Sequence, residues 1–387
     1  MRIGGPVARD PELSKSDVLK VDDFGLFCES GGFHIDPWQP VQRAVITHAH
    51  GDHARTGSKL YYCCTENLPL LQTRLGIDSK FEVHPYGEKF KIGNATVSFH
   101  PAGHILGSSQ VRVEYEGKVW VASGDYKRAH DPTCAPFEVV PCDVFITEAT
   151  FALPIYRWDS GEQTAREVLK WWDENIKENR PSLLFCYALG KAQRLLAEIY
   201  QLDPNRQAFL HGAALNLTRQ YREAGVEMIA TSPVADVPKT EKFGGELILA
   251  PPSAFRSLWM KRFKSPSTGF ASGWMRVRGA RRRKGYDRGF VLSDHADWPG
   301  LLSTARDTGA QLILPTHGAS ETLSRKLIEM GLQAEPLGLT AYENEEQEES
   351  RDEKSNAAET DAQKPAEAVA AATDAETAVD SETEANA

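Results

Sequence analysis

The sequence predicts an α/β fold in which one domain is interrupted by a second. Between positions 59 and 125, strand-like runs follow one another, with one helical stretch among them. From about position 160, helical and strand-like segments alternate, which is typical of a parallel sheet. Runs that pass from a strand into a polar loop return after position 285. We therefore expect a first domain at 1–152 and 286–342, with an inserted α/β domain at 153–285.

The first part of the chain is expected to be rich in strands. Two glycines, Gly31 and Gly32, separate the apolar runs 25–30 and 33–36, which predicts a hairpin. One helix is expected at 67–75. The further strands are expected at 60–63, 80–84, 95–100, 110–115 and 118–122.

The second part alternates between helices and short buried strands. We expect helices at 161–179, 191–200 and 215–224, with strands at 183–186 and 247–249. The segments 289–295 and 311–317 each pass from a strand into a loop and are followed by a helix. Strands that end in polar loops are how α/β enzymes display catalytic groups.

Charge is distributed unevenly along the chain. The net charge is −10 over 387 residues, but positions 343–387 alone contain 15 acidic and 3 basic residues. The preceding part contains 39 acidic and 41 basic residues and is close to neutral. The composition of 343–387, rich in Glu, Ala, Asp and Thr, predicts a disordered tail.

Cysteine usage and hydropathy indicate a cytoplasmic protein. The six cysteines show neither CxxC spacing nor a disulfide framework, which favours reduced thiols. No apolar run approaches the roughly 18 residues of a membrane span, and the N-terminus has no apolar signal region. We therefore expect no membrane association.

The strongest chemical signal is the run Thr47-His48-Ala49-His50-Gly51-Asp52-His53. Side chains alternate along an extended chain, so His48 and His50 are expected to bind the same ion. Gly51 permits a sharp turn that directs Asp52 and His53 toward a second ion. Imidazole and carboxylate suit zinc, and such sets hold two metals about 3.5–4 Å apart. The alternative, a histidine-rich loop without metal, is disfavoured by four ligand-type residues within six positions.

Three polar residues elsewhere complete this set. His104, on a glycine-flanked turn, is expected to be the third imidazole on the first zinc. Asp125 follows Gly124 at a strand end and is expected to bridge the two ions, although each of these residues alone suits an ordinary turn. Asp36 is either a turn former or the acceptor for the free N–H of a ligand histidine, and we favour the acceptor.

Glu148, His295 and His317 each close a strand-to-loop segment. We expect His317 to provide the last imidazole for the second zinc. Hydrolysis of a phosphodiester also needs a proton for the departing 3′-oxygen, and a histidine held by a carboxylate can donate it. We assign His295 as this acid and Glu148 as the residue that orients it.

Together these residues resemble a known family. The run 48–53, with His104 and Asp125, resembles the metal signature of the metallo-β-lactamase fold. The segments 147–151, 293–297 and 315–318, which contain Glu148, His295 and His317, are similar to three further motifs of its β-CASP branch, a group of DNA and RNA nucleases. The match spans residues 30–320 in the expected order.

The resemblance implies a four-layer αββα sandwich, two zinc ions and an inserted β-CASP domain that closes over the metals to form a nucleic-acid cleft. Manganese is an alternative at the second site. Segments 102–108 and 292–298 look most like the bacterial ligase-associated DNA exonucleases, whose name reflects an ATP-dependent DNA ligase and a helicase in the same repair gene clusters. We therefore expect a DNA exonuclease that uses a hydroxide activated by two zinc ions.

A basic strip lies near the end of the expected insertion. Residues 256–288 contain eleven Lys or Arg and one acidic residue. They include Arg281, Arg282, Arg283 and Lys284. The strip is either a solvated basic face or a surface that binds the nucleic-acid backbone, and we favour the second.

Two short motifs are further candidates for nucleic-acid contact. Ser272 is expected to hold a phosphate, while Trp274 either stacks on a base or belongs to the core. Lys191 and Arg194 begin a helix after a buried strand, where backbone amides can bind an anion.

Three alternative functions stay open. A β-CASP ribonuclease differs only in the sugar that it recognises. A small-molecule thioester or lactam hydrolase needs neither the insertion nor the basic strip. A catalytically dead nucleic-acid-binding scaffold would be indicated by missing ligands, and none is missing from the sequence.

Overall fold

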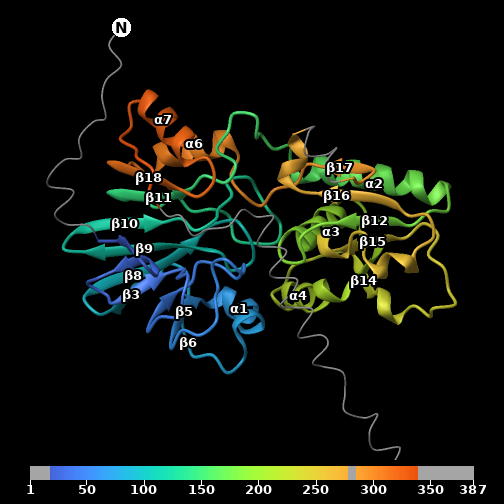
Figure 1. Cartoon of the computed structure of the whole chain (residues 1–387), viewed down its shortest axis with the longest axis horizontal. Helices are drawn as coiled ribbons and strands as arrows, with labels where there is room; N and C mark the ends of the chain where they lie inside the picture. The colour runs from blue at the N-terminus through green and yellow to red at the C-terminus, as the bar shows by residue number, and fades with distance from the viewer. Residues whose placement is uncertain (1–17, 278–284, 339–387) are drawn as a thin grey trace, which may run out of the picture.

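The structure is a computed structural model that describes residues 18–277 and 285–338. Two lobes lie side by side (Figure 1). The left-hand lobe contains two six-stranded sheets and the right-hand lobe contains a third. The chain leaves the left-hand lobe after β11 and comes back to it before α6. The tail predicted at 343–387 and the basic residues 281–284 lie outside the described residues.

The first sheet follows the order of the sequence. Its first three strands are antiparallel and the remaining pairs are parallel. The strands are β1 Lys20–Asp22, β2 Gly25–Cys28, β3 Phe33–Ile35, β4 Ala44–Val45, β5 Tyr61–Cys64 and β6 Phe81–His84. The predicted hairpin is the β2–β3 pair.

The second sheet has the order β18-β11-β10-β9-β8-β7. Strands β7 to β10 form an antiparallel meander, and β10, β11 and β18 are parallel. The strands are β7 Phe90–Ile92, β8 Ala95–Pro101, β9 Ser109–Tyr115, β10 Lys118–Ala122, β11 Val144–Glu148 and β18 Leu312–Thr316.

These two sheets pack face to face. Their core joins Phe33 and Val45 of the first sheet to Val97, Val111 and Val144 of the second, all fully buried. Alternating apolar residues along each strand direct one face inward, which is why the two sheets bury each other.

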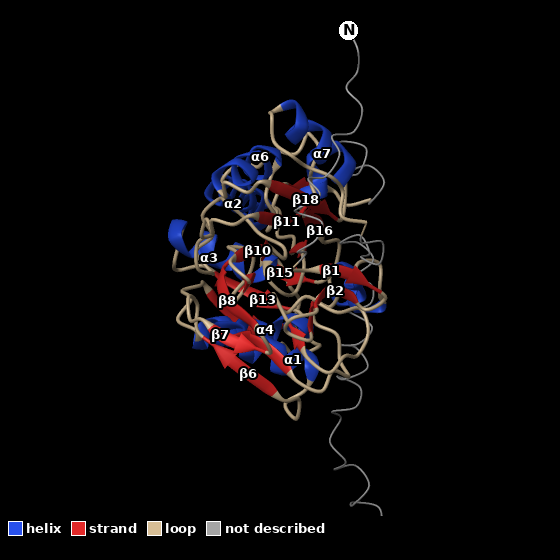
Figure 2. Cartoon of the chain, turned by 90° about the vertical axis from the view of Figure 1, so that its left-hand side faces the viewer, coloured by secondary structure: helices blue, strands red, loops and turns tan. Residues whose placement is uncertain are grey.

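Helices cover the outer faces, so the first domain has the predicted αββα layers (Figure 2). On the second sheet, Leu301 and Leu323 pack against Phe145 and Ile313. Those two leucines belong to α6 Trp298–Asp307 and α7 Ser320–Glu329. The first sheet is covered by α1 Leu68–Leu75, which follows the short helix η1 Thr65–Asn67.

The third sheet is parallel throughout, in the order β14-β13-β15-β12-β16-β17. Its strands are β12 Ser182–Phe185, β13 Gln207–Leu210, β14 Ala230–Pro233, β15 Leu247–Ala250, β16 Ser267–Ala271 and β17 Arg288–Phe290. The predicted boundary at 285 therefore falls inside this sheet, because β17 pairs with β16 rather than with a strand of the first domain.

Three helices pack on one face of the third sheet and join the core that lies over the first sheet. They are α2 Gly161–Lys177, α3 Lys191–Leu202 and α4 Gly212–Glu223. The short helices of this lobe are η2 Val234–Asp236, η3 Pro252–Ala254, η4 Leu258–Arg262 and η5 Gly273–Arg276. The predicted helices at 161–179, 191–200 and 215–224 correspond to α2, α3 and α4.

Candidate metal centre

The predicted metal ligands come from loops that follow four strands. The loop after β4 carries the cluster at 48–53, and the loops after β8, β10 and β18 carry one ligand each: His104, Asp125 and His317. Two of these loops require glycine, because a Cβ on Gly124 would lie 2.8 Å from Thr47 and one on Gly318 would lie 2.2 Å from the Ala149 carbonyl oxygen. Both glycines also have positive φ angles, of +55° and +46°.

Three imidazoles converge at one point. His50 Nδ1 lies 3.1 Å from His48 Nε2 and 3.1 Å from His104 Nε2. Asp125 Oδ2 lies 3.6 Å from His48 Nε2 and 3.8 Å from His104 Nε2. These four side chains form a first group of ligand atoms, as the sequence predicts.

A second group adjoins the first and shares Asp125. His53 Nε2 lies 3.1 Å from Asp52 Oδ2 and 3.4 Å from Asp125 Oδ2. Asp125 therefore lies between the two groups, in the position expected of a bridging carboxylate. We refer to the residues of both groups as the histidine pocket: His48, His50, Asp52, His53, His104 and Asp125.

Asp36 and Thr47 fix the orientation of two of the imidazoles. Asp36 Oδ2 accepts from the Thr47 hydroxyl at 2.5 Å and from His53 Nδ1 at 2.7 Å. Because the threonine proton is directed to Asp36, Thr47 Oγ1 accepts from His48 Nδ1, 3.0 Å away. The Nε2 atoms of His48 and His53 therefore face the pocket.

Backbone carbonyls orient the other two imidazoles in the same way. His104 Nδ1 donates to the Asp294 carbonyl oxygen at 2.8 Å, and His50 Nε2 lies 3.5 Å from that of Leu189. A carbonyl oxygen can only accept, so the Nε2 of His104 and the Nδ1 of His50 face the pocket as lone pairs. The facing nitrogens of His48, His50 and His104 thus converge on one point, where a divalent cation could bind.

Burial keeps several of these groups ready to bind a cation. It lowers the pKa of His104 to about 3 and that of His48 well below its usual value, so both are neutral near pH 7. Burial alone also disfavours a charged His53, but Asp52, Asp125 and Asp36 outweigh it and raise the pKa of His53 well above the ordinary value. Three buried carboxylates around one imidazole indicate a site built for positive charge.

The ligand set fits zinc. Zinc–nitrogen bonds of about 2.0–2.1 Å in a tetrahedron place neighbouring nitrogens about 3.3 Å apart. The two 3.1 Å separations from His50 Nδ1 lie close to this value. Mixed imidazole and carboxylate ligands are also the set that catalytic zinc sites use.

His317 approaches the second group. Its ring centroid lies 6.2 Å from that of His53, and both residues line one cavity with Glu148. The residue has a φ of +61°, in the left-handed region that a non-glycine residue seldom adopts, and this conformation directs the chain out of β18 toward the pocket. Burial lowers the pKa of His317 to about 4, which leaves it neutral.

Glu148 and His295 form a buried pair beside the pocket. Glu148 Oε2 accepts from His295 Nδ1 at 2.8 Å, and Glu148 Oε1 accepts from the backbone N–H of Tyr126 at 2.8 Å. Ligand-type atoms of this pair and of Asp125 lie within 4.8 Å of one another. Burial raises the pKa of Glu148, partly offset by its histidine partner.

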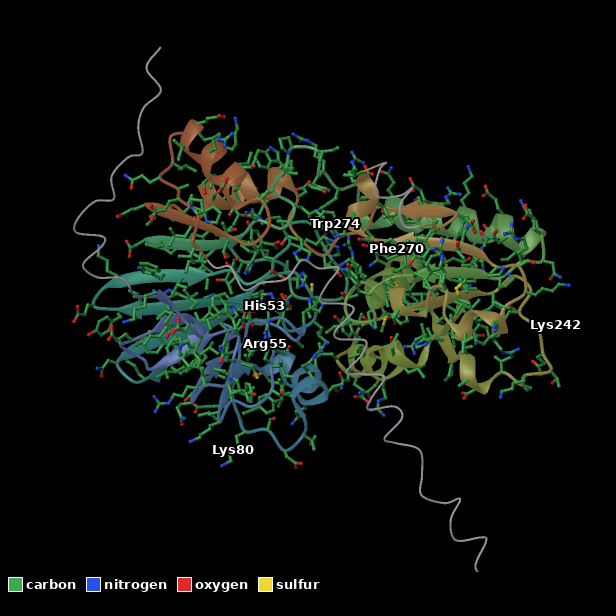
Figure 3. All side chains as sticks on the ribbon, viewed as in Figure 1. His53, Arg55, Lys80, Lys242, Phe270 and Trp274 are labelled. Atoms are coloured by element: carbon green, nitrogen blue, oxygen red, sulfur yellow. The ribbon has the colours of Figure 1, made fainter. Side chains whose placement is uncertain are left out.

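Trp274 lies near the junction of the lobes (Figure 3). It is half-buried and packs against Phe151 and Tyr156, with ring centroids 4.9 and 5.8 Å away. Phe151 in turn contacts the ring of His295 edge-on at 5.7 Å. Ser272 is fully buried, and its hydroxyl accepts from the Trp274 backbone N–H at 3.3 Å.

The expected nucleic-acid contacts of Lys191 and Arg194 are corrected by the structure. Both are at most 3% exposed, so their side chains do not reach a surface where nucleic acid binds. Each is instead held by buried carboxylates, and the carboxyl oxygens nearest to them lie 3.2 Å from Lys191 Nζ and 3.1 Å from Arg194 Nε. We refer to these cations and their buried partners as the interdomain ion cluster: Lys127, Asp131, Lys191, Arg194, Glu198 and Asp294.

The basic strip is described only in part. Arg281, Arg282, Arg283 and Lys284 lie outside the described residues. Among the described cations, Arg262 donates to backbone carbonyls between Val237 and Glu241, which is a structural role. Arg276 and Arg288 form ion pairs with Asp159 and Glu174 at 3.4 and 3.6 Å.

Sequence reasoning did not find Thr47, Asp294 or Trp158, which hold functional side chains in place. Thr47 directly precedes the histidine run, so its position was a usable signal. Asp294 acts on His104 through a backbone carbonyl, and Trp158 donates to the His295 carbonyl at 2.9 Å. Backbone acceptors leave no signature in residue type.

None of the helices in the described part of the chain combines the length and apolar character of a membrane span. No family model matches the chain. Its sequence is similar to several curated proteins. A probable DNA ligase of Opitutus terrae is 30% identical over 316 residues, which cover 81% of this chain and 30% of that protein.

Two other relatives carry ribonuclease names. An RNase J-like protein of Methanocaldococcus jannaschii is 26% identical over 208 residues, 48% of this chain and 49% of that protein. Ribonuclease TTHA0252 of Thermus thermophilus is 26% identical over 199 residues, 43% and 44% of the two chains. The chain thus spans less than half the length of each of these relatives.

A solved structure supports the fold. A crystal structure of a protein of unknown function from Enterococcus faecalis superposes with a TM-score of 0.50 at 14% identity. The superposition covers 70% of this chain and 74% of that one.

Proposed function

We propose that this chain, which belongs to the β-CASP branch of the metallo-β-lactamase fold, is a metal-dependent nuclease that removes nucleotides from DNA ends. One observation carries the proposal. Four imidazoles and two carboxylates converge on a common pocket, and a carboxylate-held histidine lies beside it. That combination suits hydrolysis of a phosphodiester, which needs charge neutralisation, a nucleophile and an acid.

The pocket residues and His317 would bind two divalent cations. His48, His50 and His104 would hold one divalent cation, Asp52, His53 and His317 the other, and Asp125 would lie between them. Two zinc ions, when bound, neutralise a phosphate and generate a nucleophile from water at neutral pH. Manganese is an alternative at the second position.

His295 and Glu148 provide the proton for the leaving group. Because Glu148 accepts from His295 Nδ1, the opposite ring nitrogen, Nε2, is the atom that gives up a proton. The departing 3′-oxygen would receive it. Glu148 is itself fixed by the Tyr126 N–H, so the imidazole is oriented before substrate binds.

Nucleic acid would bind along the junction between the lobes. The half-buried Trp274 is separated from His295 by the ring of Phe151, which contacts both. Trp274 would stack on a base, and Ser272, whose hydroxyl accepts from the Trp274 N–H, would lie next to it. The basic residues of 256–288 would bind the phosphate backbone, and Arg281, Arg282, Arg283 and Lys284 would contribute most.

DNA is favoured over RNA by one observation. The match to a probable DNA ligase extends over 316 residues, whereas the matches to ribonuclease-named relatives extend over about 200. We therefore place the activity in DNA repair, with an ATP-dependent ligase and a helicase as partners. A β-CASP ribonuclease is the second candidate, favoured by those ribonuclease names.

One assay tests both candidates. Purified protein is incubated with single-stranded DNA and matched RNA, labelled at the 5′ or the 3′ end, with zinc or with a chelator. A ladder of DNA products that the chelator abolishes supports the proposal. Cleavage of RNA alone would move the assignment to the ribonuclease, and cleavage that survives chelation would reject the metal-dependent mechanism.

A further inference from the structure

The segment Ser293–His295 is fixed at three successive backbone carbonyls. Each carbonyl accepts from a different part of the chain. That of Ser293 accepts from Lys127 Nζ at 2.9 Å and Arg194 Nη1 at 2.7 Å, that of Asp294 from His104 Nδ1 at 2.8 Å, and that of His295 from Trp158 Nε1 at 2.9 Å. Such a segment cannot shift without breaking several bonds at once.

The side chain of Asp294 ties this segment to the inserted domain. Its Oδ2 lies 3.2 Å from Lys191 Nζ, and its Oδ1 lies 3.6 Å from Arg194 Nη1. Both cations come from the first turn of α3. Gly190, at the start of this helix, has a φ of +89°, and a Cβ there would lie 3.3 Å from Asp294 Oδ2. The beginning of α3 therefore packs directly against the carboxylate.

The same short segment serves two functional histidines. His104 depends on the Asp294 carbonyl for the hydrogen bond that leaves its Nε2 facing the pocket. His295 is the next residue along the chain. A displacement of Asp294 would thus rotate a metal-binding imidazole and move the proposed acid together.

We infer that Lys191 and Arg194 are positioning residues, through which α3 of the inserted domain sets the pose of His104 and His295. They act through Asp294 and Ser293 rather than by touching nucleic acid. The part of this inference that concerns turnover rests on the proposed nuclease function. The part that concerns His104 and metal retention does not.

A simpler role for these cations is to balance the buried charge of Asp294. Removing one partner of a buried ion pair leaves an uncompensated charge, whereas removing both does not. The double variant Lys191→Met/Asp294→Asn therefore separates the two roles. If only charge balance matters, the double variant behaves like the unaltered protein.

The test compares Lys191→Met, Asp294→Asn, their combination and the conservative Lys191→Arg. Replacing a residue that hydrogen-bonds to a metal ligand typically lowers activity or metal affinity by about 10–100-fold. We expect Lys191→Met to lose turnover by about that factor with little change in KM, and to release zinc faster to a competing chelator. Lys191→Arg should recover most of both. Lys170→Met, an exposed position on α2, is the matched control and should change neither.

The double variant should regain the melting temperature but not the turnover or the zinc retention. Recovery of all three would overturn the inference in favour of charge balance. If Lys191→Met does not fold, the double variant and Lys191→Arg still distinguish a positioning role from simple charge balance.

A readout without substrate separates this inference from the proposed function. The His104 Nδ1–H proton, observed by ¹⁵N NMR of the zinc-loaded protein, should shift or disappear in Lys191→Met and return in Lys191→Arg. An unchanged signal with unchanged zinc retention would overturn the inference. Absence of cleavage by the unaltered protein would instead reject the nuclease proposal and leave this result standing.

Discussion

Two buried polar clusters lie within this molecule, and they differ in how their charge is satisfied. The interdomain ion cluster contains three cations and three carboxylates, each with a partner of opposite charge. The histidine pocket contains two carboxylates and four imidazoles whose ring nitrogens converge with them. Burial of charge costs several kcal/mol per ion unless it is paired, so paired ions suit a structural role, whereas converging ligand-type groups suit a bound cation.

The difference shows how a binding site can be told from a structural network. Both clusters contain residues that the sequence analysis selects as functional. The interdomain ion cluster joins two domains through pairs of opposite charge, whereas the histidine pocket consists of groups that could hold a metal ion. Variants of each cluster should therefore respond differently to added metal.

The largest effect is expected from Asp52→Ala. Removing a carboxylate ligand should lower the zinc content measured by atomic emission and reduce turnover by more than the roughly 100-fold that partners behind a ligand are worth. Zinc should also raise the melting temperature of the unaltered protein but not of this variant. The exposed Asp78→Ala is the control. Full zinc occupancy in Asp52→Ala would remove Asp52 from the pocket.

His295→Ala should separate chemistry from metal binding. A general acid contributes about 10²–10⁴-fold, so turnover should fall by that factor while the zinc content stays unchanged. The two quantities are measured on the same preparation. Wild-type turnover in this variant would reject the assignment of His295 as the acid.

Asp131→Asn should act on stability rather than on zinc, because Asp131 does not contact the segment Ser293–His295. It leaves Lys127 and Arg194 with less negative charge in a buried place, which costs about 3–5 kcal/mol. Denaturant unfolding should show the same loss with zinc and with a chelator. Arg166→Met, which breaks an exposed i,i+4 pair with Glu162, should cost no more than about 1 kcal/mol. If zinc restored the lost free energy of unfolding, the two clusters would have to be treated as one metal-binding site.

The smallest effect is expected at the surface. Replacing Arg281, Arg282 and Arg283 by Glu should weaken DNA binding and flatten its dependence on salt, because fewer counterions are released. The prediction rests on the sequence, since these residues lie outside the described part. Fluorescence anisotropy at several salt concentrations measures it. An unchanged slope would show that the strip does not bind the backbone.

Much of the fold could be predicted because its patterns are local. The alternating strands of the first domain and the amphipathic helices α2, α3 and α4 follow directly from residue spacing. The short strands β13 and β16 were missed, since Gln207–Leu210 and Ser267–Ala271 carry weak apolar patterns. β17 was assigned to the other domain because a three-residue strand does not indicate which sheet it will join.

For the candidate site, residue type decided what could be predicted. Histidines and aspartates at strand ends carry a chemical signal, and the structure brings His48, His50, His104 and Asp125 together. Lys191 and Arg194 were misread because position at a helix start suggested an anion site. Their true partners, chiefly Asp294 and Asp131, lie about 60 to 100 positions away, and no local pattern reports such a distance.

The order of the pocket along the chain has a consequence for biosynthesis. All six residues of the histidine pocket precede the insertion, while the neighbouring His295 and His317 follow it, and β18 joins the second sheet by pairing with β11. A chain that ends anywhere within the insertion lacks His295 and His317, the proposed acid and the last proposed ligand. If the proposed function holds, no cleavage activity is expected before translation has passed residue 317.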